Sequence, residues 1–239
     1  MYNKESKPKK FRNFYGRLKG KGLRALQQKL LNDQLEKLSI PAVKYEINPD
    51  RKLIKLSDLF KNVTSFSLEI GFGGGEHLVY QAERNPNIGF IGCEPYINGV
   101  AMLAGKLSKT ELTNVRIHPG DVRDLFDVLT DDSIDNVFLL YPDPWPKKRH
   151  HRRRFVTSEY LIDLQRVMKT GALLKLATDI PDYVRQSLQE VCKHHFSWTA
   201  TDAQDWRECW SDWMPTRYER KALREGRRPY YLTFEKRES

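Results

Sequence analysis

Cysteine is scarce in this chain of 239 residues. It has three, Cys93, Cys192 and Cys209, and none of them belongs to a Cys-x-x-Cys pair. An odd number of scattered cysteines argues against both a disulfide framework and a structural zinc site. The histidine pairs at 150–151 and 194–195 are adjacent in sequence and lack the i, i+4 spacing that aims two imidazoles at one metal. We therefore expect a reducing compartment and no metal.

Long apolar runs are absent as well. No stretch approaches the ~20 residues that a membrane-spanning helix needs, and the basic N-terminal segment lacks the apolar core of a signal peptide. The sequence predicts a cytoplasmic protein without membrane attachment. Nothing in it requires a protein partner, and a monomer is expected.

Acidic residues are nearly missing from three segments, which hold the excess positive charge. The formal net charge is +10. Residues 1–22 have eight Lys or Arg against one Glu, residues 147–154 have six against none, and residues 217–228 have six against two. The rest of the chain has 21 basic and 28 acidic residues. An acidic body with three basic segments is typical of a protein that contacts nucleic-acid phosphates, although each run alone is equally compatible with a solvated surface.

The order of segments predicts one domain with an N-terminal extension. Residues 1–22 combine their basic residues with a few aromatic ones, and this composition predicts a flexible basic arm. The same composition is equally compatible with an arm that clamps RNA. Residues 23–239 have the length and apolar content of a single core. Leucines at helical spacing predict a helix from residue 23 to residue 38, which Pro41 ends.

Short strands and helices then alternate to the end of the chain. The predicted strands are Ser65–Ile70, Ile88–Cys93, Val115–Ile117, Ile134–Leu140, Ala172–Ala177, Phe196–Ala200 and Tyr230–Phe234. The predicted helices cover residues 75–84, 98–108, 123–129, 157–168 and 181–195. This alternation predicts an α/β fold with a doubly wound, mostly parallel sheet of seven strands, helices on both faces and ligands at the carboxyl ends of the strands.

A glycine-rich turn follows the first predicted strand, in Glu69-Ile70-Gly71-Phe72-Gly73-Gly74-Gly75. Glycines such as Gly71 and Gly73 permit a tight turn, and the helix after it points free N–H groups at a ligand. Glu94 ends the second strand, 23 residues past Gly71, where a carboxylate can accept both hydroxyls of a ribose. Asp121 ends the third strand and can accept from an adenine amino group. The ends of three strands thus offer a backbone turn and two carboxylates that can bind an adenosine.

Two cofactor classes fit such a turn. Nicotinamide dinucleotide enzymes share the first turn and the acid of the second strand, but Glu76 occupies the place of their third glycine and would put a carboxylate near a pyrophosphate. The only Tyr-x-x-x-Lys pair, Tyr15 to Lys19, precedes the turn, where a short-chain reductase would not have it. S-adenosylmethionine has no phosphate, and its cationic sulfonium and ammonium groups suit an acidic turn. The sequence favours this donor.

A second segment places one acid among prolines and aromatic residues, Tyr141-Pro142-Asp143-Pro144-Trp145-Pro146, and six basic residues follow it within 147–154. These basic residues more readily grip phosphates than select bases. They are Lys147, Lys148, Arg149, Arg152, Arg153 and Arg154. A cofactor turn and a charged reaction loop on one domain indicate an enzyme that acts on nucleic acid.

Four pieces, in this order and spacing, resemble the bacterial tRNA (guanine-N7)-methyltransferases. They are Glu69-Ile70-Gly71-Phe72-Gly73, Tyr141-Pro142-Asp143-Pro144-Trp145-Pro146-Lys147, Ala177-Thr178-Asp179 and Thr216-Arg217-Tyr218-Glu219. The resemblance runs from about residue 23 to the C-terminus. It implies a class I methyltransferase fold with its Rossmann-like sheet, S-adenosyl-L-methionine as donor, and methylation of N7 of guanine 46 in the tRNA variable loop.

The resemblance also implies roles for single residues. Glu69, Glu94, Asp121 and Asp143, with Gly71 and Gly73, would line the donor site, and Asp143 would be catalytic. Lys147, Asp179, Thr216, Arg217, Tyr218 and Glu219 would meet the tRNA. Guanine N7 carries an unshared pair and no proton, so its attack on a methyl group needs no general base. We therefore expect Asp143 to act by positioning and electrostatics.

Alternative roles stay open for several of these residues. Asp179 is also placed to cap the helix that begins at Pro181, and Glu219 to pair with Arg220 or Arg224. Trp145 either braces its loop against the sheet or stacks near the target guanine. A further stripe, Trp206, Trp210 and Trp213, has the spacing of one helix face, which favours core packing over base stacking.

Two other functions fit parts of the pattern. A non-catalytic RNA-binding protein on the same fold explains the basic segments but not the four acids together. A methyltransferase acting on an exocyclic amine would use Asp143 to accept the departing proton.

Overall fold

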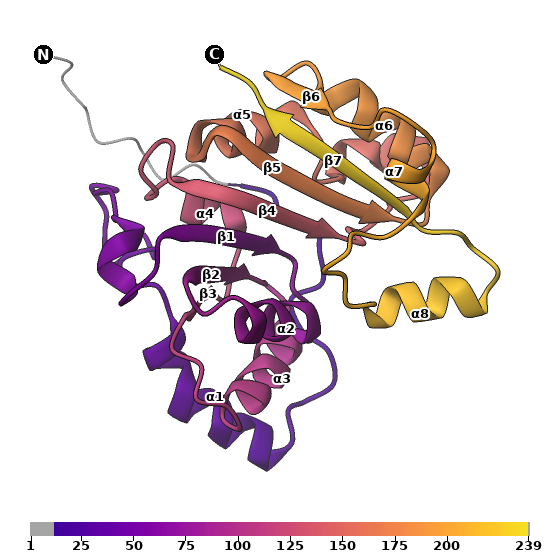
Figure 1. Ribbon diagram of the computed structural model, residues 1–239. Helices are drawn as coiled ribbons and strands as arrows, with labels where there is room; N and C mark the ends of the chain where they lie inside the picture. Colours follow the sequence, from indigo (N-terminus) through magenta and orange to yellow (C-terminus); the bar gives the residue numbers. More distant parts are fainter. Residues whose placement is uncertain (1–11, 239) are drawn as a thin grey trace, which may run out of the picture.

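The computed structural model of the chain, which describes residues 12–238, contains one sheet of seven strands (Figure 1). In chain order the strands are β1 (Ser65–Ile70), β2 (Ile88–Cys93), β3 (Val115–His118), β4 (Ile134–Leu140), β5 (Met168–Thr178), β6 (Phe196–Trp198) and β7 (Tyr230–Lys236). They lie in the order β3-β2-β1-β4-β5-β7-β6, and β7 is antiparallel to both of its neighbours while the other pairs are parallel. The predicted α/β class and mostly parallel sheet are confirmed.

The centre of the sheet determines where a ligand can bind. β1 pairs on one side with β2, with Glu69 beside Gly92, and on the other with β4, with Ile70 beside Leu139. The chain leaves β1 toward β2 and returns to β4 on the other side, so the strand order reverses here. In an open parallel sheet this reversal leaves a crevice beyond the carboxyl ends of the strands.

Helices cover both faces of the sheet. They are α1 (Ala25–Leu38), α2 (Glu76–Arg84), α3 (Ile97–Leu107), α4 (Val122–Phe126), α5 (Ser158–Val167), α6 (Pro181–Val191), α7 (Gln204–Arg207) and α8 (Arg217–Arg224), with 3-10 turns η1 (Leu56–Leu59) and η2 (Lys148–Arg153). Helices α1 to α3 pack on β2 and β3 around Phe90, Leu103 and Ile117. Helices α4 to α6 pack on the other face around Leu125 and Leu174. No helix within residues 12–238 is long and apolar enough to cross a bilayer.

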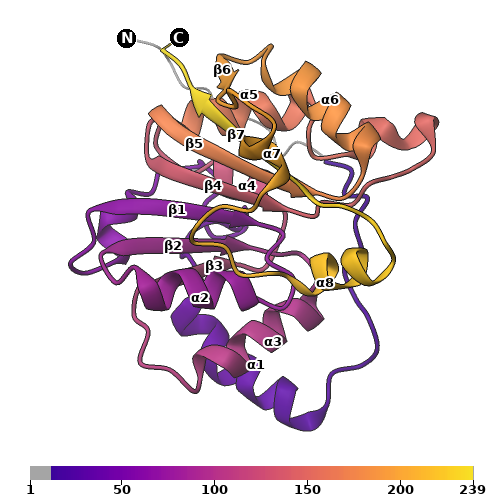
Figure 2. The same ribbon diagram turned by 45° about the vertical axis from the view of Figure 1, so that its right-hand side comes forward.

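Several element bounds differ from the prediction. β5 begins at Met168 rather than Ala172, because Met168 pairs with Ile134 across a register shift in β4. The predicted helical stripe of tryptophans is wrong, since α7 ends at Arg207 and only Trp206 lies in it. Helix α8, absent from the prediction, projects from the body beside the carboxyl ends of the strands (Figures 1 and 2).

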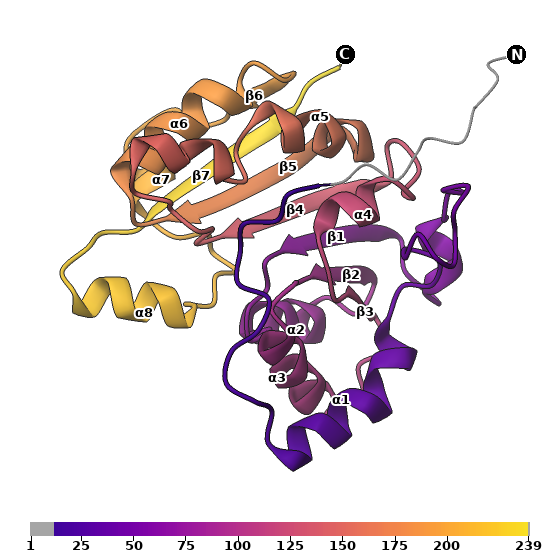
Figure 3. The same cartoon turned by 180° about the vertical axis from the view of Figure 1, so that it is seen from behind.

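Residues 12–22 run past the carboxyl ends of the strands before the chain enters α1 (Figure 3). The Arg12 guanidinium donates to Asp127 at 2.7 and 2.8 Å, and the Gly20 N–H donates to the Asn98 side chain at 2.8 Å. The Ile97 N–H donates to the carbonyl of Leu18 at 3.1 Å. Composition did not predict these contacts, because they are polar and bury little apolar surface. The flexibility of the arm stays a prediction, and residues 1–11 lie outside the described residues.

Candidate active site at the carboxyl edge of the sheet

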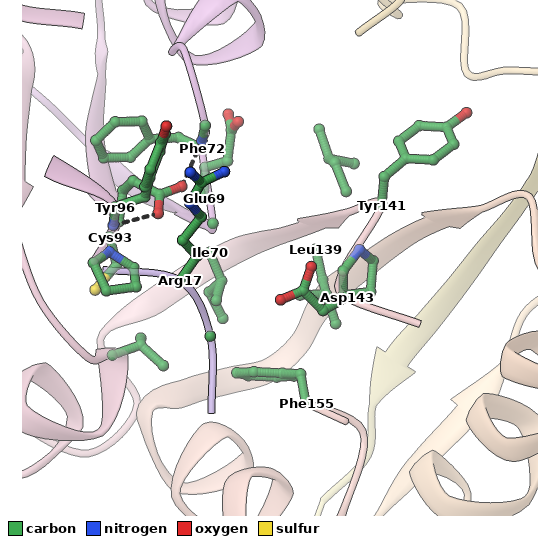
Figure 4. A pocket seen from close by; sticks show the side chains of 18 of the residues that line it. Arg17, Glu69, Ile70, Phe72, Cys93, Tyr96, Leu139, Tyr141, Asp143 and Phe155 are labelled. Carbon is green, nitrogen blue, oxygen red and sulfur yellow. Dashed lines mark hydrogen bonds between the residues drawn. The ribbon is translucent and has the colours of Figure 1, made fainter. Parts of the chain in front are cut away.

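A cavity of about 420 Å³ opens at the carboxyl ends of β1 and β4, and we call it the edge cavity. Its size is that of a site for a small organic molecule. Its lining comes from residues 14–17, 69–74, 76–77, 93–96, 120–122, 139–143 and 216–218, with Trp145, Arg153, Phe155 and Tyr160. Figure 4 shows Arg17, Glu69 and Tyr96 on one side of the cavity and Tyr141 and Asp143 on the other.

The glycine turn after β1 forms the floor of the cavity. Gly71, Gly73 and Gly75 have φ values of 75°, 55° and 74°, a region that side chains other than glycine rarely adopt. Gly99 of α3 packs directly under the turn, since a Cβ there would lie 2.2 Å from the Gly73 carbonyl oxygen. The backbone is therefore bare where a ligand would approach it.

Glu69 is buried below this turn and is paired with a histidine that the sequence did not single out. The Nδ1 atom of His77, in the first turn of α2, lies 2.8 Å from a Glu69 carboxylate oxygen. The rings of Phe138 and Trp213 pack against the His77 imidazole at centroid distances of 4.6 and 5.3 Å. The pair is thus fixed in position at the wall of the cavity.

Glu94 is fixed by backbone donors. One carboxylate oxygen accepts from the Gly73 N–H at 2.7 Å and the other from the Tyr96 N–H at 2.8 Å. Burial raises the pKa of Glu94 above its ordinary value, while the two N–H donors act to lower it. Each oxygen keeps a free lone pair, so the carboxylate can still accept from ribose hydroxyls.

Asp121 lies at the third strand end, as predicted, with a partner of its own. It caps α4 by accepting from the Arg123 N–H at 2.9 Å, and the Arg123 guanidinium pairs with both carboxylate oxygens. The residue still lines the edge cavity. Its contact with adenine stays a prediction.

Asp143 stands in a loop of unusual backbone geometry. Tyr141 and Trp145, two residues to either side, have φ values of 50° and 40°, which cost energy for side chains of this size. The carboxylate is exposed to the cavity and accepts no hydrogen bond from any donor in residues 12–238. The partly desolvated surroundings raise its pKa above the ordinary value. An acid held without a partner is free to act on a ligand.

Arg154 connects the Asp143 loop to α6 on the side away from the cavity. The predicted contact of Arg154 with tRNA is wrong. Its side chain is 1% exposed. It donates to the Pro144 carbonyl at 2.7 Å, to Gln186 at 2.8 Å and to Asp182 at 2.9 Å. A buried guanidinium with these partners cannot reach a phosphate outside, and it ties the Asp143 loop to α6.

The other basic residues of η2, together with Lys147 directly before it, divide into two groups. Lys147, Lys148, Arg149 and Arg152 are exposed and available to phosphates. Arg153 turns inward and lines the edge cavity.

The C-terminal substrate candidates lie at the mouth of the cavity or behind it. Thr216 caps α8 by accepting from the Glu219 N–H at 3.1 Å, Arg217 lies 3.2 Å from Glu76, and Tyr218 is 66% exposed. These three line the cavity, whereas Glu219 is buried.

Glu219 and Asp179 have partners other than those considered from the sequence. The Glu219 carboxylate accepts from the Trp213 indole at 2.8 Å and the Tyr231 hydroxyl at 2.7 Å, which replaces the alternative of pairing within α8. Asp179 lies 3.0 Å from Arg227, and α6 begins after Ile180 without a side-chain cap. The capping alternative is therefore wrong, and the contacts of both acids with tRNA stay predictions.

Sequence reasoning missed His77, Tyr96, Tyr15 and Arg17 as cavity residues. His77 had a local signal, because it stands two residues after the last glycine of the turn and eight residues after Glu69. For Arg17 and Tyr15 the sequence carried no signal of a place at the cavity, since only the path of the arm brings them here. No group of three His, Cys, Asp or Glu placed for a metal ion occurs in residues 12–238.

The sheet order, the antiparallel β7 and the acids at the first two strand ends define a class I methyltransferase. Solved structures agree on the fold. "Structure of an Antibiotic Related Methyltransferase" matches with a TM-score of 0.56 at 18% identity over 79% of this chain and 98% of that one. The 16S rRNA methyltransferase KamB matches with a TM-score of 0.55 at 15% identity over 76% and 92%.

Sequence relatives give the family. A family described as "Putative methyltransferase" matches residues 64–232. The tRNA (guanine-N(7)-)-methyltransferase of Roseobacter denitrificans is 60% identical over 97% of this chain and 98% of its own length. That of Agrobacterium fabrum is 47% identical over 94% and 95%. The chain belongs to the bacterial tRNA (guanine-N7)-methyltransferases, and the resemblance drawn from its motifs is confirmed.

Proposed function

We propose that this protein transfers the methyl group of S-adenosyl-L-methionine to N7 of guanine 46 in the variable loop of tRNA. The observation that carries the proposal is the arrangement of acids around the edge cavity. Glu69 and Glu94 are fixed by partners on one side, and Asp143 faces them from the other without a partner. A donor site and a reactive acid share one cavity.

The residues of the cavity suit this donor. It carries a sulfonium and an ammonium group, and the wall offers Glu69, Glu94 and Asp143 as anions. The bare turn at Gly71 and Gly73 allows close approach to the backbone. When bound, the donor supplies an electrophilic methyl group.

The protein contributes a fixed position for the reacting groups and a negative charge beside them. The loop around Asp143 is held by two prolines and by Arg154, so the carboxylate keeps a defined position at the cavity. Because guanine N7 has no proton to lose, Asp143 need not act as a base. Its negative charge stabilises the positive charge that moves onto the base as the new bond forms.

Docking of the tRNA falls to the surface around the mouth. Lys147, Lys148, Arg149 and Arg152 are exposed there and contact phosphates, while Thr216 to Tyr218 border the opening. Phosphate contacts of this kind orient an RNA without reading its bases. With tRNA as substrate, the protein works in the cytoplasm.

A product analysis tests the proposal. The purified protein is incubated with labelled S-adenosyl-L-methionine and unmodified tRNA transcripts, and the RNA is digested and the modified position mapped. N7-methylguanosine at position 46, absent from a transcript with adenine there, is the expected result. N6-methyladenosine would indicate the exocyclic-amine reaction, and bound but unmethylated tRNA would indicate a binding protein.

A further inference from the structure

Arg153, the last residue of η2, lies against two aromatic rings at the wall of the edge cavity. Its Cζ atom is 4.8 Å from the centroid of the Tyr15 ring and 5.0 Å from that of the Trp145 ring. Both distances are within the range of a cation–π interaction. Tyr15 comes from the arm and Trp145 from the Asp143 loop, so the guanidinium joins two segments far apart in the sequence.

The surroundings of Arg153 are those of a weakly held cation. Its Nε atom is buried and has no hydrogen-bond partner, and within residues 12–238 no carboxylate forms an ion pair with Arg153. A guanidinium in a protein normally satisfies its donors with oxygens. The faces of the Tyr15 and Trp145 rings are therefore the main neighbours of the Arg153 guanidinium. The space beside these two rings accepts a flat cation.

This place adjoins the reacting groups. Tyr15, Trp145 and Arg153 all line the edge cavity, and Trp145 is two residues from Asp143. The φ of 40° at Trp145 is a strained backbone conformation for a side chain of this size. Strain of this kind is found where a side chain is held for a function.

The reaction makes a flat cation at this point. The bond between the methyl carbon and sulfur breaks with its electron pair left on sulfur, and the N7 lone pair forms the new bond. No proton moves, and the base gains a positive charge spread over its rings. An aromatic face attracts such a base more strongly than the neutral guanine.

We infer that Tyr15 and Trp145 form the seat of the target guanine, and that Arg153 occupies this seat until the base enters. The inference rests on the proposed function and names two catalytic residues for it. The rings stack on the base and stabilise the charge that develops on it. The displaced guanidinium then lies beside the phosphates that the rest of η2 contacts.

The test compares two forms of the tRNA on ring-deleting and ring-keeping variants. Dissociation constants are measured for the unmodified transcript and for the same tRNA after methylation by the wild-type protein. The wild type is expected to bind the methylated form about tenfold more tightly, which is within the range of cation–π contacts. Tyr15→Leu and Trp145→Leu lose this preference and about tenfold in kcat, whereas Tyr15→Phe and Trp145→Phe keep most of both.

Donor affinity and a distant tryptophan serve as controls. Binding of S-adenosylhomocysteine by calorimetry is expected to be unchanged in all four variants. Trp198→Leu, at an exposed tryptophan of β6 on the far edge of the sheet, should leave the preference and the rate as they are.

The outcomes separate this inference from the proposed function. If the wild type makes no N7-methylguanosine, both are overturned. If it does, but the preference is absent or survives in both Leu variants, the seat alone is wrong. A loss of donor affinity that accounts for the loss of rate would mean that the rings only close the arm over the donor, which also overturns the seat.

Discussion

At the scale of single residues, the same chemical group has different roles because its neighbours differ. Glu94 accepts from two backbone N–H groups, and Glu69 is paired with a buried imidazole. Asp143 has no such partner and faces the cavity. Carboxylates already bound in place can hold a ligand in a defined pose, whereas a free one can respond to charge that appears during a reaction.

Asp143→Ala is expected to lower kcat for methyl transfer at least about a hundredfold, since it removes a charge placed for the transition state. The exposed side chain makes no contact that the fold needs, so thermal unfolding and tRNA binding should stay near the wild type. Asp143→Asn keeps the shape and serves as the matched variant, with a similar loss. Single-turnover kinetics measure the effect, and a rate within a few-fold of wild type for Asp143→Ala would remove this residue from the mechanism.

His77→Leu is expected to lower the free energy of unfolding by about 3 kcal/mol, because it leaves the Glu69 carboxylate buried without its partner. Both side chains are nearly inaccessible, with exposures of 2% and 4%. Urea denaturation measures the loss. The double variant Glu69→Gln, His77→Leu removes the uncompensated charge and should be less destabilised than the single one. Equal losses in the two would show that the contact with Glu69 is not what His77 contributes.

At the scale of elements, local pattern predicted the strands well and the C-terminal segments poorly. The predicted bounds of β1, β2 and β4 match the structure, because each is a short apolar run ended by a turn and buried in the sheet. The segment after α7 gave a false helical pattern. Trp210 and Trp213 donate instead to Thr233 and Glu219, contacts that no local spacing reveals.

The candidate site divides in the same way. Glu69, Glu94 and Asp143 could be predicted, since each lies at or shortly after the end of a strand and parallel strands end at one edge. Arg154 could not be told from its basic neighbours, because its burial depends on packing against α6. Tyr15 reaches the cavity only through the path of the arm, which depends on contacts with α3 and α4.

Arg154→Leu is expected to destabilise the protein by about 2 kcal/mol, because it removes a buried guanidinium and leaves the partly buried acceptors of Pro144 and Gln186 without donors. It should also lower the rate of methyl transfer, since Pro144 adjoins Asp143. Thermal and urea unfolding, with kcat on the folded variant, measure both effects. Arg152→Ala removes an exposed arginine from the same turn and should change stability by less than about 0.5 kcal/mol. Similar stability of the two variants would contradict the anchoring role.

The buried imidazole of His118, at the end of β3, is expected to make the free energy of unfolding depend on pH. Burial lowers the pKa of its imidazole to about 4, and its Nε2 atom has no hydrogen-bond partner. The unfolded chain takes up this proton near pH 6.5 and the folded chain only near pH 4, so stability falls as the pH drops through that window. The loss attributable to this residue is at most about 3 kcal/mol.

Urea denaturation between pH 7.5 and pH 4 checks this, with His118→Gln as the matched variant. Carboxylates that titrate near pH 4 affect both proteins alike, so the difference between the two curves isolates the imidazole. The wild type should lose more stability than the variant over the window. Parallel curves would show that His118 can be protonated in the folded state.

At the scale of the whole molecule, the excess positive charge is concentrated in a few segments and is not distributed evenly along the chain. The body is acidic, and the exposed basic residues of η2 lie beside the edge cavity whose wall carries the donor acids. Anionic RNA is therefore attracted to one place, and the acids inside keep phosphates out of the donor site. The same arrangement predicts that RNA binding and donor binding respond separately to changes of surface charge.

Replacement of Lys147, Lys148, Arg149 and Arg152 by glutamine tests this separation. Each lost phosphate contact reduces the magnitude of the slope of log K against log salt by about 0.7 to 0.9. For tRNA binding, the slope of the fourfold variant should therefore be smaller in magnitude than that of the wild type by about 3. The side chains are exposed and do not line the edge cavity, so affinity for S-adenosylhomocysteine should be unchanged. A matched variant that removes four exposed lysines outside the cavity, Lys29, Lys37, Lys61 and Lys109, changes the net charge equally. Equal slopes for the two variants would mean that the tRNA is attracted by net charge alone, whereas a lower slope only for the η2 variant assigns the phosphate contacts to the turn that follows Asp143.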